Sequence, residues 1–351
     1  MKLFEHPDFR NAVIAAREHF ALLELTEQFI EKDYYVTEAL RIVATQWPNQ
    51  VIFKGGTSLS KGWKLIERFS EDIDLFLNRQ AFIPPLGANR VDRELEAIET
   101  AVGNHPGLRV EQTLGRRKRG VYRNSYFIYD QQFVGLAAIA NRVFLEMGTR
   151  SGTYPTQTVM LCSYVAEFLH ENGESLDTED ESSFPMLLLD FRRTFVEKLF
   201  TIHSKVVKSQ EDGQPIGAYA RHYYDLFCLA KQFEVEELLQ SDEYSQLKED
   251  CDRISQEHFP DYDAPEGMKF SNSLALFPTG ELRQTLKREY EQQCSSLCYG
   301  NYPAWEEVEA CFEELRDWPD GVTRKLECRQ YQAHSSQSLL KKRQFIRLIC
   351  H

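Results

Sequence analysis

Two aspartates separated by a single residue, Asp72 and Asp74, are the side chains of this sequence best suited to chemistry. The surrounding run, Asp-Ile-Asp-Leu-Phe, is typical of a strand, and residues two apart on a strand point to the same face. Two carboxylates held side by side repel each other unless a cation lies between them. Oxygen ligands of this kind suit Mg²⁺, or Mn²⁺ in its place, together with substrate phosphates. The spacing therefore predicts a metal site at these aspartates.

A glycine turn lies one short segment before the aspartates. The apolar run 51–53 predicts a strand that stops at Gly55–Gly56, and Thr57 or Ser58 can cap a following helix with apolar residues within 63–66. Such a turn presents backbone N–H groups to an anion without a Cβ in the way, so Gly55, Gly56 and Thr57 or Ser58 are expected to cradle a triphosphate. A Gly-Gly pair alone is usually an ordinary turn, and an Asp-x-Asp alone is usually a solvated strand edge. A glycine turn followed by a short helix and then by Asp-x-Asp favours a nucleoside triphosphate (NTP) site.

The order of glycine turn, helix and Asp-x-Asp resembles the signature of the DNA polymerase β-like nucleotidyltransferase superfamily. The sequence K-G-G-T-S-L-S-K, followed by R-F-S-E-D-I-D-L, is similar to the motifs of the AbiEii/AbiGii toxin family, the toxin half of abortive-infection toxin–antitoxin pairs. This resemblance covers residues 30–232. It implies a nucleotidyltransferase that uses Mg²⁺ and an NTP, a separately encoded antitoxin and a role in phage defence. MenA-like relatives in this family transfer nucleotides to the 3′ acceptor end of tRNA, which makes tRNA or another RNA the expected acceptor.

Two further catalytic positions follow from the resemblance. Glu146, on a predicted strand over 142–148, matches the third carboxylate that the superfamily places beside the Asp-x-Asp strand. There it would deprotonate the attacking hydroxyl or complete a second metal position, unless it is an ordinary exposed glutamate. Lys198, in a predicted helix over 189–207, matches a lysine that contacts nucleotide phosphates in the family. Its neighbour Glu197 would orient it or lie at the surface.

The sequence R-H-Y-Y-D resembles the R-x-x-x-D motif of the same family. Its ends, Arg221 and Asp225, are four residues apart on one helical face, so they can pair with each other or both line the cleft. The family implies that Asp225 is essential for activity, and His222 is a lesser candidate. Arg221 is expected to contribute to nucleotide binding.

The net charge of −13 makes a uniformly basic surface impossible, so contact with nucleic acid must come from a local patch. The run Arg116, Arg117, Lys118 and Arg119 is the patch expected to guide an RNA backbone, on a polar connection between short strands. A second basic cluster, within 341–347, is expected to be solvated surface. Two lysines flank the glycine turn, Lys54 and Lys61, and either can add a phosphate contact.

The elements that must position these residues form an α+β fold. We expect a mixed-sheet, polymerase β-like nucleotidyltransferase lobe with N-terminal helices over residues 1–182, followed by a mainly helical lobe over 183–351 that completes the cleft. The division is placed in the polar, acidic segment 171–183. Lys32 and Asp33, in the N-terminal helices, are expected to be surface or cap residues.

Composition favours a cytoplasmic protein. No apolar run is long enough to span a membrane, and the N-terminal segment lacks the apolar core of a signal peptide. The eight cysteines have no zinc-site spacing, which fits a reducing compartment. Two other functions remain open for this site: nucleotide transfer to a small molecule or protein side chain, and a nucleotide-binding or partner-binding module without catalysis.

Overall fold

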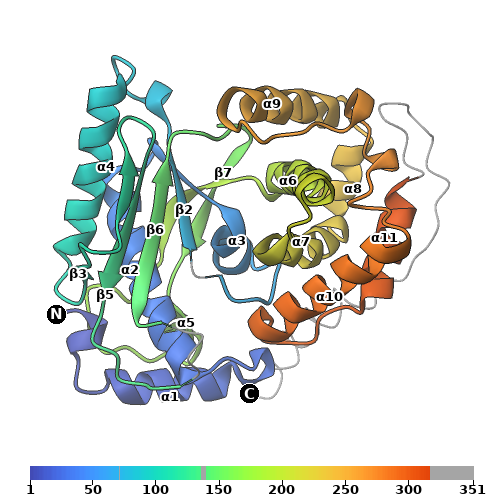
Figure 1. Ribbon diagram of the computed structural model, residues 1–351. Helices are drawn as coiled ribbons and strands as arrows, with labels where there is room; N and C mark the ends of the chain where they lie inside the picture. Colours follow the sequence, from blue (N-terminus) through green and yellow to red (C-terminus); the bar gives the residue numbers. More distant parts are fainter. Residues whose placement is uncertain (71, 136–139, 317–351) are drawn as a thin grey trace. The chain divides into compact units, whose positions relative to one another are not determined.

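The computed structural model describes residues 1–70, 72–135 and 140–316, and it contains a mixed sheet of eight strands (Figure 1). The basic cluster within 341–347 lies outside the described residues. The strand order is β3-β5-β6-β2-β1-β8-β7, with β4 paired to β5; β2 runs parallel to β6, and β1 runs parallel to β8. The strands are β1 (Val51–Lys54), β2 (Asp72–Leu77), β3 (Arg109–Val110), β4 (Arg116–Lys118), β5 (Tyr122–Ile128), β6 (Arg142–Gly148), β7 (Thr156–Leu161) and β8 (Phe184–Leu189).

Helices cover one face of this sheet. The helices α2 (Glu27–Gln46) and α4 (Ala88–Gly103) pack there, while α1 (Phe9–His19) and α5 (Tyr164–Glu171) pack against each other and α2. Alternate residues of the central strands, including Ile73, Leu75 and Leu145, are buried in this core. Because successive strand residues point to opposite faces, Asp72, Asp74 and Glu146 are directed to the other face.

A second core is entirely helical. The described helices that build it centre on α6 (Phe191–Asp212) and α7 (Arg221–Ala230), and Leu59 and Ile66, from the segment between β1 and β2, are buried in the same core. A sheet region followed by a mainly helical region is the expected fold. The remaining helices are α8 (Phe233–Leu239), α9 (Asp242–His258), α10 (Gly280–Leu297) and α11 (Trp305–Arg316).

The strand β8 has no counterpart in the sequence prediction, which expected a mainly helical region after residue 183. It pairs with β1 and β7, so the sheet continues past the expected division at residue 182. The described residues also all belong to one compact unit. The division into two lobes therefore stays a prediction about organisation.

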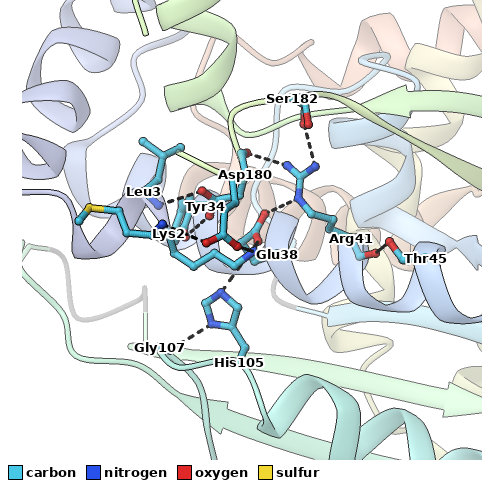
Figure 2. A network of polar contacts seen from close by, with 12 residues as sticks. Lys2, Leu3, Tyr34, Glu38, Arg41, Thr45, His105, Gly107, Asp180 and Ser182 are labelled. Carbon is cyan, nitrogen blue, oxygen red and sulfur yellow. Dashed lines mark hydrogen bonds and ion pairs between the residues drawn. The ribbon is translucent and has the colours of Figure 1, made fainter. Parts of the chain in front are cut away.

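The acidic segment within 171–183 is bound to the N-terminal region (Figure 2). The Asp180 carboxylate accepts hydrogen bonds from the Leu3 backbone N–H at 2.9 Å and from the Tyr34 hydroxyl at 2.6 Å. The Arg41 guanidinium donates to the carbonyl oxygens of Asp180 and Ser182. These bonds hold the segment before β8 on α2, so it does not behave as a free linker.

Two local expectations are wrong. The helix after the glycine turn is short: α3 (Gly55–Thr57) continues into a π-helical turn, Ser58–Gly62, and residues 63–66 lie outside it. Gly62 packs against the Leu188 side chain, which leaves no room for a Cβ, and Lys64 then adopts a positive φ of 54°. Lys32 and Asp33 are buried, with 2% and 7% exposure, because α2 packs on several elements at once.

Within the described residues, no helix is long and apolar enough to cross a membrane.

Candidate active site

Three carboxylates and one lysine lie in adjacent positions on the face of the sheet opposite α2 and α4. Asp72 and Asp74 belong to β2, and the register places Glu146 of β6 directly beside Asp74. On the other side of Asp74, β1 contributes Lys54 at the paired position. The glutamate therefore lies on the strand beside the Asp-x-Asp strand, as expected, whereas its role remains a prediction.

The carboxylates raise one another's proton affinity. Burial raises the pKa of Asp74 to about 7, and repulsion from Glu146 and Asp72 adds to this while Lys54 opposes it. Partial desolvation also raises the pKa of Glu146, with repulsion from Asp72 as the next cause. A cation between these oxygens would relieve the repulsion, so the donor set fits Mg²⁺. Among the residues that the structure describes, no three His, Cys, Asp or Glu side chains converge on one metal position. Mg²⁺ held by one or two carboxylates takes water and substrate phosphates as its other ligands.

The glycine turn packs directly against the acids. Gly55 has a φ of +76°, and a Cβ at this position would overlap the Asp74 carboxylate. A Cβ on Gly56 would lie 2.7 Å from a guanidinium nitrogen of Arg68. Gly55 is thus required for both its backbone conformation and its close approach, and Gly56 for its close approach.

The hydroxyl groups after the glycines are used within the turn. Thr57 donates its hydroxyl hydrogen to the Asp72 carbonyl oxygen, and Ser58 donates to the Gly55 carbonyl oxygen at 2.9 Å. The first bond ties the turn to the strand that carries the acids. The two side chains therefore stabilise the turn, and their contact with a nucleotide stays a prediction.

Asp225 lies at the centre of a buried cluster of charges. Its carboxylate forms two bonds with the Arg68 guanidinium, at 2.6 and 2.7 Å, and an ion pair with Lys198 Nζ at 2.8 Å. Burial alone would raise the pKa of Asp225, but the charges of Arg68 and Lys198 outweigh it and hold this pKa well below its usual range. The structure thus brings together two residues, Lys198 and Asp225, that the sequence placed on separate helices.

His222 completes this cluster as a neutral side chain. Burial, together with the adjacent Lys198 charge, lowers the pKa of His222 to about 3. The Nδ1 atom of this neutral ring lies 3.0 Å from Lys198 Nζ, and we assign it as the acceptor because the ammonium group can only donate. Burial also lowers the pKa of Lys198, with Arg68 as a further cause and Asp225 opposing it.

Arg68 is a site residue that the sequence interpretation missed. It lies between the glycine turn and Asp72, inside the matched wording R-F-S-E-D-I-D, but local spacing gives no sign that it pairs with a residue 157 positions away. Arg221, four residues before Asp225, points elsewhere: its guanidinium lies 3.9 Å from the Asp72 carboxylate. Arg221 and Asp225 therefore do not pair with each other: Arg221 is directed toward Asp72, whereas Asp225 is buried.

The lysines beside the glycine turn have different surroundings. Lys54 Nζ donates to Ser151 Oγ at 2.9 Å and pairs with Glu197 at 3.3 Å, so Glu197 orients Lys54 rather than Lys198. Lys61 Nζ instead binds Asp33 at 2.6 Å, in a pair whose side chains are each 7% exposed. Phosphate contact by Lys61 would require breaking this buried pair.

A pocket of about 380 Å³ opens beside the acids. Its wall includes Asp74, Glu146 and Lys54 at one end and Phe259, which follows α9, at another. The rest of its lining comes from β2, the start of β5 with the residue before it, the end of β6 and the residues that follow β6: Leu75, Phe76, Val121, Tyr122, Met147, Gly148, Thr149, Arg150 and Ser151. This pocket gives a substrate access to Asp74 and Glu146.

The predicted basic patch is a strand and not a connection, because 116–118 pair with β5 as β4. Arg116 lies opposite Asn124, which in turn lies opposite Glu146, so Arg116 and Lys118 share the face of the acids. Arg117 points to the opposite face, beside Arg123, whose guanidinium binds Glu99 of α4 at 2.6 Å. Arg119, just after the strand, donates to Asn89. Strand alternation thus divides the patch between two faces.

Comparisons with known proteins identify the family of this chain. The family model for the nucleotidyl transferase AbiEii toxin of type IV toxin–antitoxin systems matches residues 39–314. Among solved structures, the nucleotidyltransferase toxin MenT4 of Mycobacterium tuberculosis H37Rv shares 14% identity, with a TM-score of 0.47 over 90% of this chain and 88% of that one. A nucleotidyltransferase candidate from H. pylori shares 15% identity, with a TM-score of 0.35 over 83% and 99% of the two chains. No curated protein matches significantly. The acids, the glycine turn and the Asp225 cluster all lie within the span of the family model.

Proposed function

Because the chain belongs to the AbiEii family of nucleotidyltransferase toxins, we propose that its site transfers a nucleotide from an NTP to the 3′ end of an RNA, with tRNA as the acceptor and Mg²⁺ as the cofactor. The family match makes the chain a nucleotidyltransferase and the toxin of a type IV toxin–antitoxin system, which implies a separate antitoxin. The substrates place the reaction in the cytoplasm. The observation that carries the proposal is the placement of three carboxylates on one face of the sheet, with the Asp74 carboxylate packed against Gly55 of the glycine turn.

The chain's own residues have distinct tasks in this reaction. Asp72 and Asp74 would hold the metal, which when bound supplies positive charge to the phosphate oxygens. The backbone of Gly55–Gly56 binds the triphosphate, and Lys198 supplies a further positive charge to it. Lys54 lies directly opposite Asp74 on the neighbouring strand β1, and its ammonium group keeps positive charge beside the carboxylates. Asp225 acts as a positioning residue, because it holds Lys198 through a 2.8 Å ion pair.

The chemical step is an in-line displacement at the α-phosphorus. The oxygen of the acceptor hydroxyl forms a bond to this phosphorus, the bond to the β-phosphate oxygen breaks, and pyrophosphate leaves. The hydroxyl proton goes to Glu146, whose pKa is raised by desolvation and by repulsion from Asp72, which makes it a stronger base than an ordinary glutamate. No oxidant or further reactant is needed.

The experiment incubates purified protein with total tRNA, Mg²⁺ and each α-³²P-labelled NTP in turn. Label on tRNA is expected for one or more nucleotides, and it should disappear in Asp72→Ala/Asp74→Ala and after chelation of the metal. Glu234→Ala/Glu237→Ala, which removes two exposed carboxylates from α8, is the matched control and should retain transfer. Label on protein or on a small molecule, with none on RNA, would replace the RNA acceptor by the alternative substrates. NTP binding without any transfer would indicate a non-catalytic module.

A further inference from the structure

A stacked aromatic pair lies beside the acids on the face of the sheet that carries them. The rings of Tyr126 on β5 and Phe144 on β6 have centroids 4.3 Å apart and planes inclined by only 5°. Both side chains are partly exposed. The register places Phe144 opposite Asp72 on one side and opposite Tyr126 on the other, so the acid and the two rings form one row across three strands.

Positive charges surround this pair. The Arg142 guanidinium lies 5.2 Å from the centroid of the Tyr126 ring, in a cation–π arrangement. Arg116 and Lys118, on the next strand, are exposed and share the same face. Within the described ranges no carboxylate forms an ion pair with any of these three cations, in a chain whose net charge is −13. Their charge is therefore available to an anionic partner.

The pair lies on the side of the acids where an acceptor should enter. The glycine turn follows β1, on one side of β2, whereas Phe144 and Tyr126 lie on β6 and β5, on the other side. In an in-line displacement the attacking oxygen and the leaving oxygen are on opposite sides of the phosphorus. With strands about 4.8 Å apart, the row from Asp72 to Tyr126 spans about 10 Å, which is the scale of a terminal nucleotide and its neighbour.

We propose that Tyr126, Phe144 and Arg142 form a stacking platform for the 3′-terminal bases of a single-stranded RNA acceptor, with Arg116 and Lys118 binding its phosphates. The proposal rests on the proposed function only in that the acceptor is RNA. Base stacking on aromatic rings is tolerant of sequence, and backbone contacts by arginine and lysine are equally so. An acceptor such as a small metabolite would need neither the rings nor a row of cations.

The test measures RNA binding without NTP, so that it does not depend on catalysis. A fluorescently labelled single-stranded RNA is titrated with the wild type and with Tyr126→Leu/Phe144→Leu, which keeps apolar bulk but removes both aromatic faces. Binding is expected to weaken by about tenfold or more, given the usual contribution of base–aromatic stacking. Arg116→Gln should weaken binding and lower the magnitude of the salt-dependence slope by about 0.7, the value for one phosphate contact on a single strand. Tyr126→Phe/Phe144→Tyr, which keeps both rings, should restore most of the binding that the leucine variant loses. Phe233→Leu, which removes an exposed ring on α8, is the control and should bind as the wild type does.

Steady-state kinetics of nucleotide transfer then distinguish the stacking platform from the proposed function. The double leucine variant should have a raised KM for RNA and an unchanged KM for NTP. Equal RNA affinity for this variant and the wild type would overturn the platform, even if the wild type labels tRNA. A raised KM for NTP with unchanged RNA affinity would also overturn it and assign the rings to the nucleotide base. If the wild type binds RNA through the platform but labels none, the proposed function fails while the platform stands. Thermal unfolding of each variant, with Arg116→Gln as the substitution of an exposed side chain, guards against misfolding as the cause.

Discussion

Arg68 and Asp225 form a buried, bidentate ion pair, at 2.6 and 2.7 Å, that joins the segment before β2 to α7. The same segment is held by backbone bonds to the end of α10: Phe69 N–H donates to the Leu297 carbonyl at 2.7 Å, and Tyr299 N–H donates to the Glu67 carbonyl at 3.1 Å. The chain that leads into the Asp-x-Asp strand is therefore fixed by the helical region. Because Asp225 also pairs with Lys198, this attachment fixes the position of the carboxylates on the sheet relative to Lys198 on α6.

Removing Asp225 should affect both stability and activity. Asp225→Ala leaves the Arg68 guanidinium buried without its partner, so we expect a loss of about 3–5 kcal/mol in the free energy of unfolding. Arg68→Met/Asp225→Leu, which replaces both members of the bidentate pair with apolar groups, should recover the part of this stability that the unpaired Arg68 charge costs. It should not recover nucleotide transfer, because Lys198 would still lack its carboxylate. Urea unfolding and labelled transfer measure the two effects. Full activity in the double variant would exclude a positioning role for Asp225.

The close approach of Gly55 to Asp74 predicts the effect of a single methyl group. Gly55→Ala places a Cβ against the Asp74 carboxylate and also forces alanine to a φ of +76°. Gly213→Ala is a matched control, since Gly213 has a φ of +69° and no atom lies within 4 Å of the position that its new methyl group would take. Both should lose about 1 kcal/mol from backbone strain. Only Gly55→Ala should also abolish transfer, and equal activity of the two variants would contradict the packing described.

The raised pKa of Asp74 has a consequence for the metal-free protein. A carboxyl group whose folded pKa is raised contributes stability that is complete below the unfolded pKa and is lost as pH rises through the folded value, here about 7. Asp74→Asn should therefore become progressively more stable than the wild type between about pH 4 and pH 7, by up to about 1.4 kcal/mol per pH unit, although it loses transfer. Urea unfolding with a chelator present measures this difference. A difference that is constant with pH would show that Asp74 titrates normally.

His222 should produce a pH dependence of the opposite sign. Its folded pKa is lowered to about 3, so its contribution to stability is complete above the unfolded value of about 6.5 and is lost as pH falls from there towards 3. The wild type should lose up to about 1.4 kcal/mol per pH unit in this window through His222 alone. In His222→Gln, which cannot take up a proton, unfolding free energy should depend less steeply on pH. Identical slopes for the two proteins would mean that the histidine is protonated in the folded state.

Local sequence patterns predicted the centre of the site. The strand before the glycine turn, the two glycines and the paired aspartates follow from rules that act over a few residues: alternation on a strand and the absence of a Cβ. The resemblance added Glu146, Lys198 and Asp225, and the structure places Glu146 beside Asp74 and Lys198 beside Asp225. It does not test their catalytic roles.

Only the tertiary structure decided how distant residues pair. The partner of Asp225 is Arg68 and not Arg221, the basic run 116–119 is divided between two faces by the pairing of β4 with β5, and Lys61 is bound to Asp33. The strand β8 forms because β1 and β7 lie beside it, which no pattern within its own six residues indicates. Short-range rules determine which way a side chain points from its own element, whereas ion pairs and strand neighbours depend on the packing of elements that are far apart in sequence.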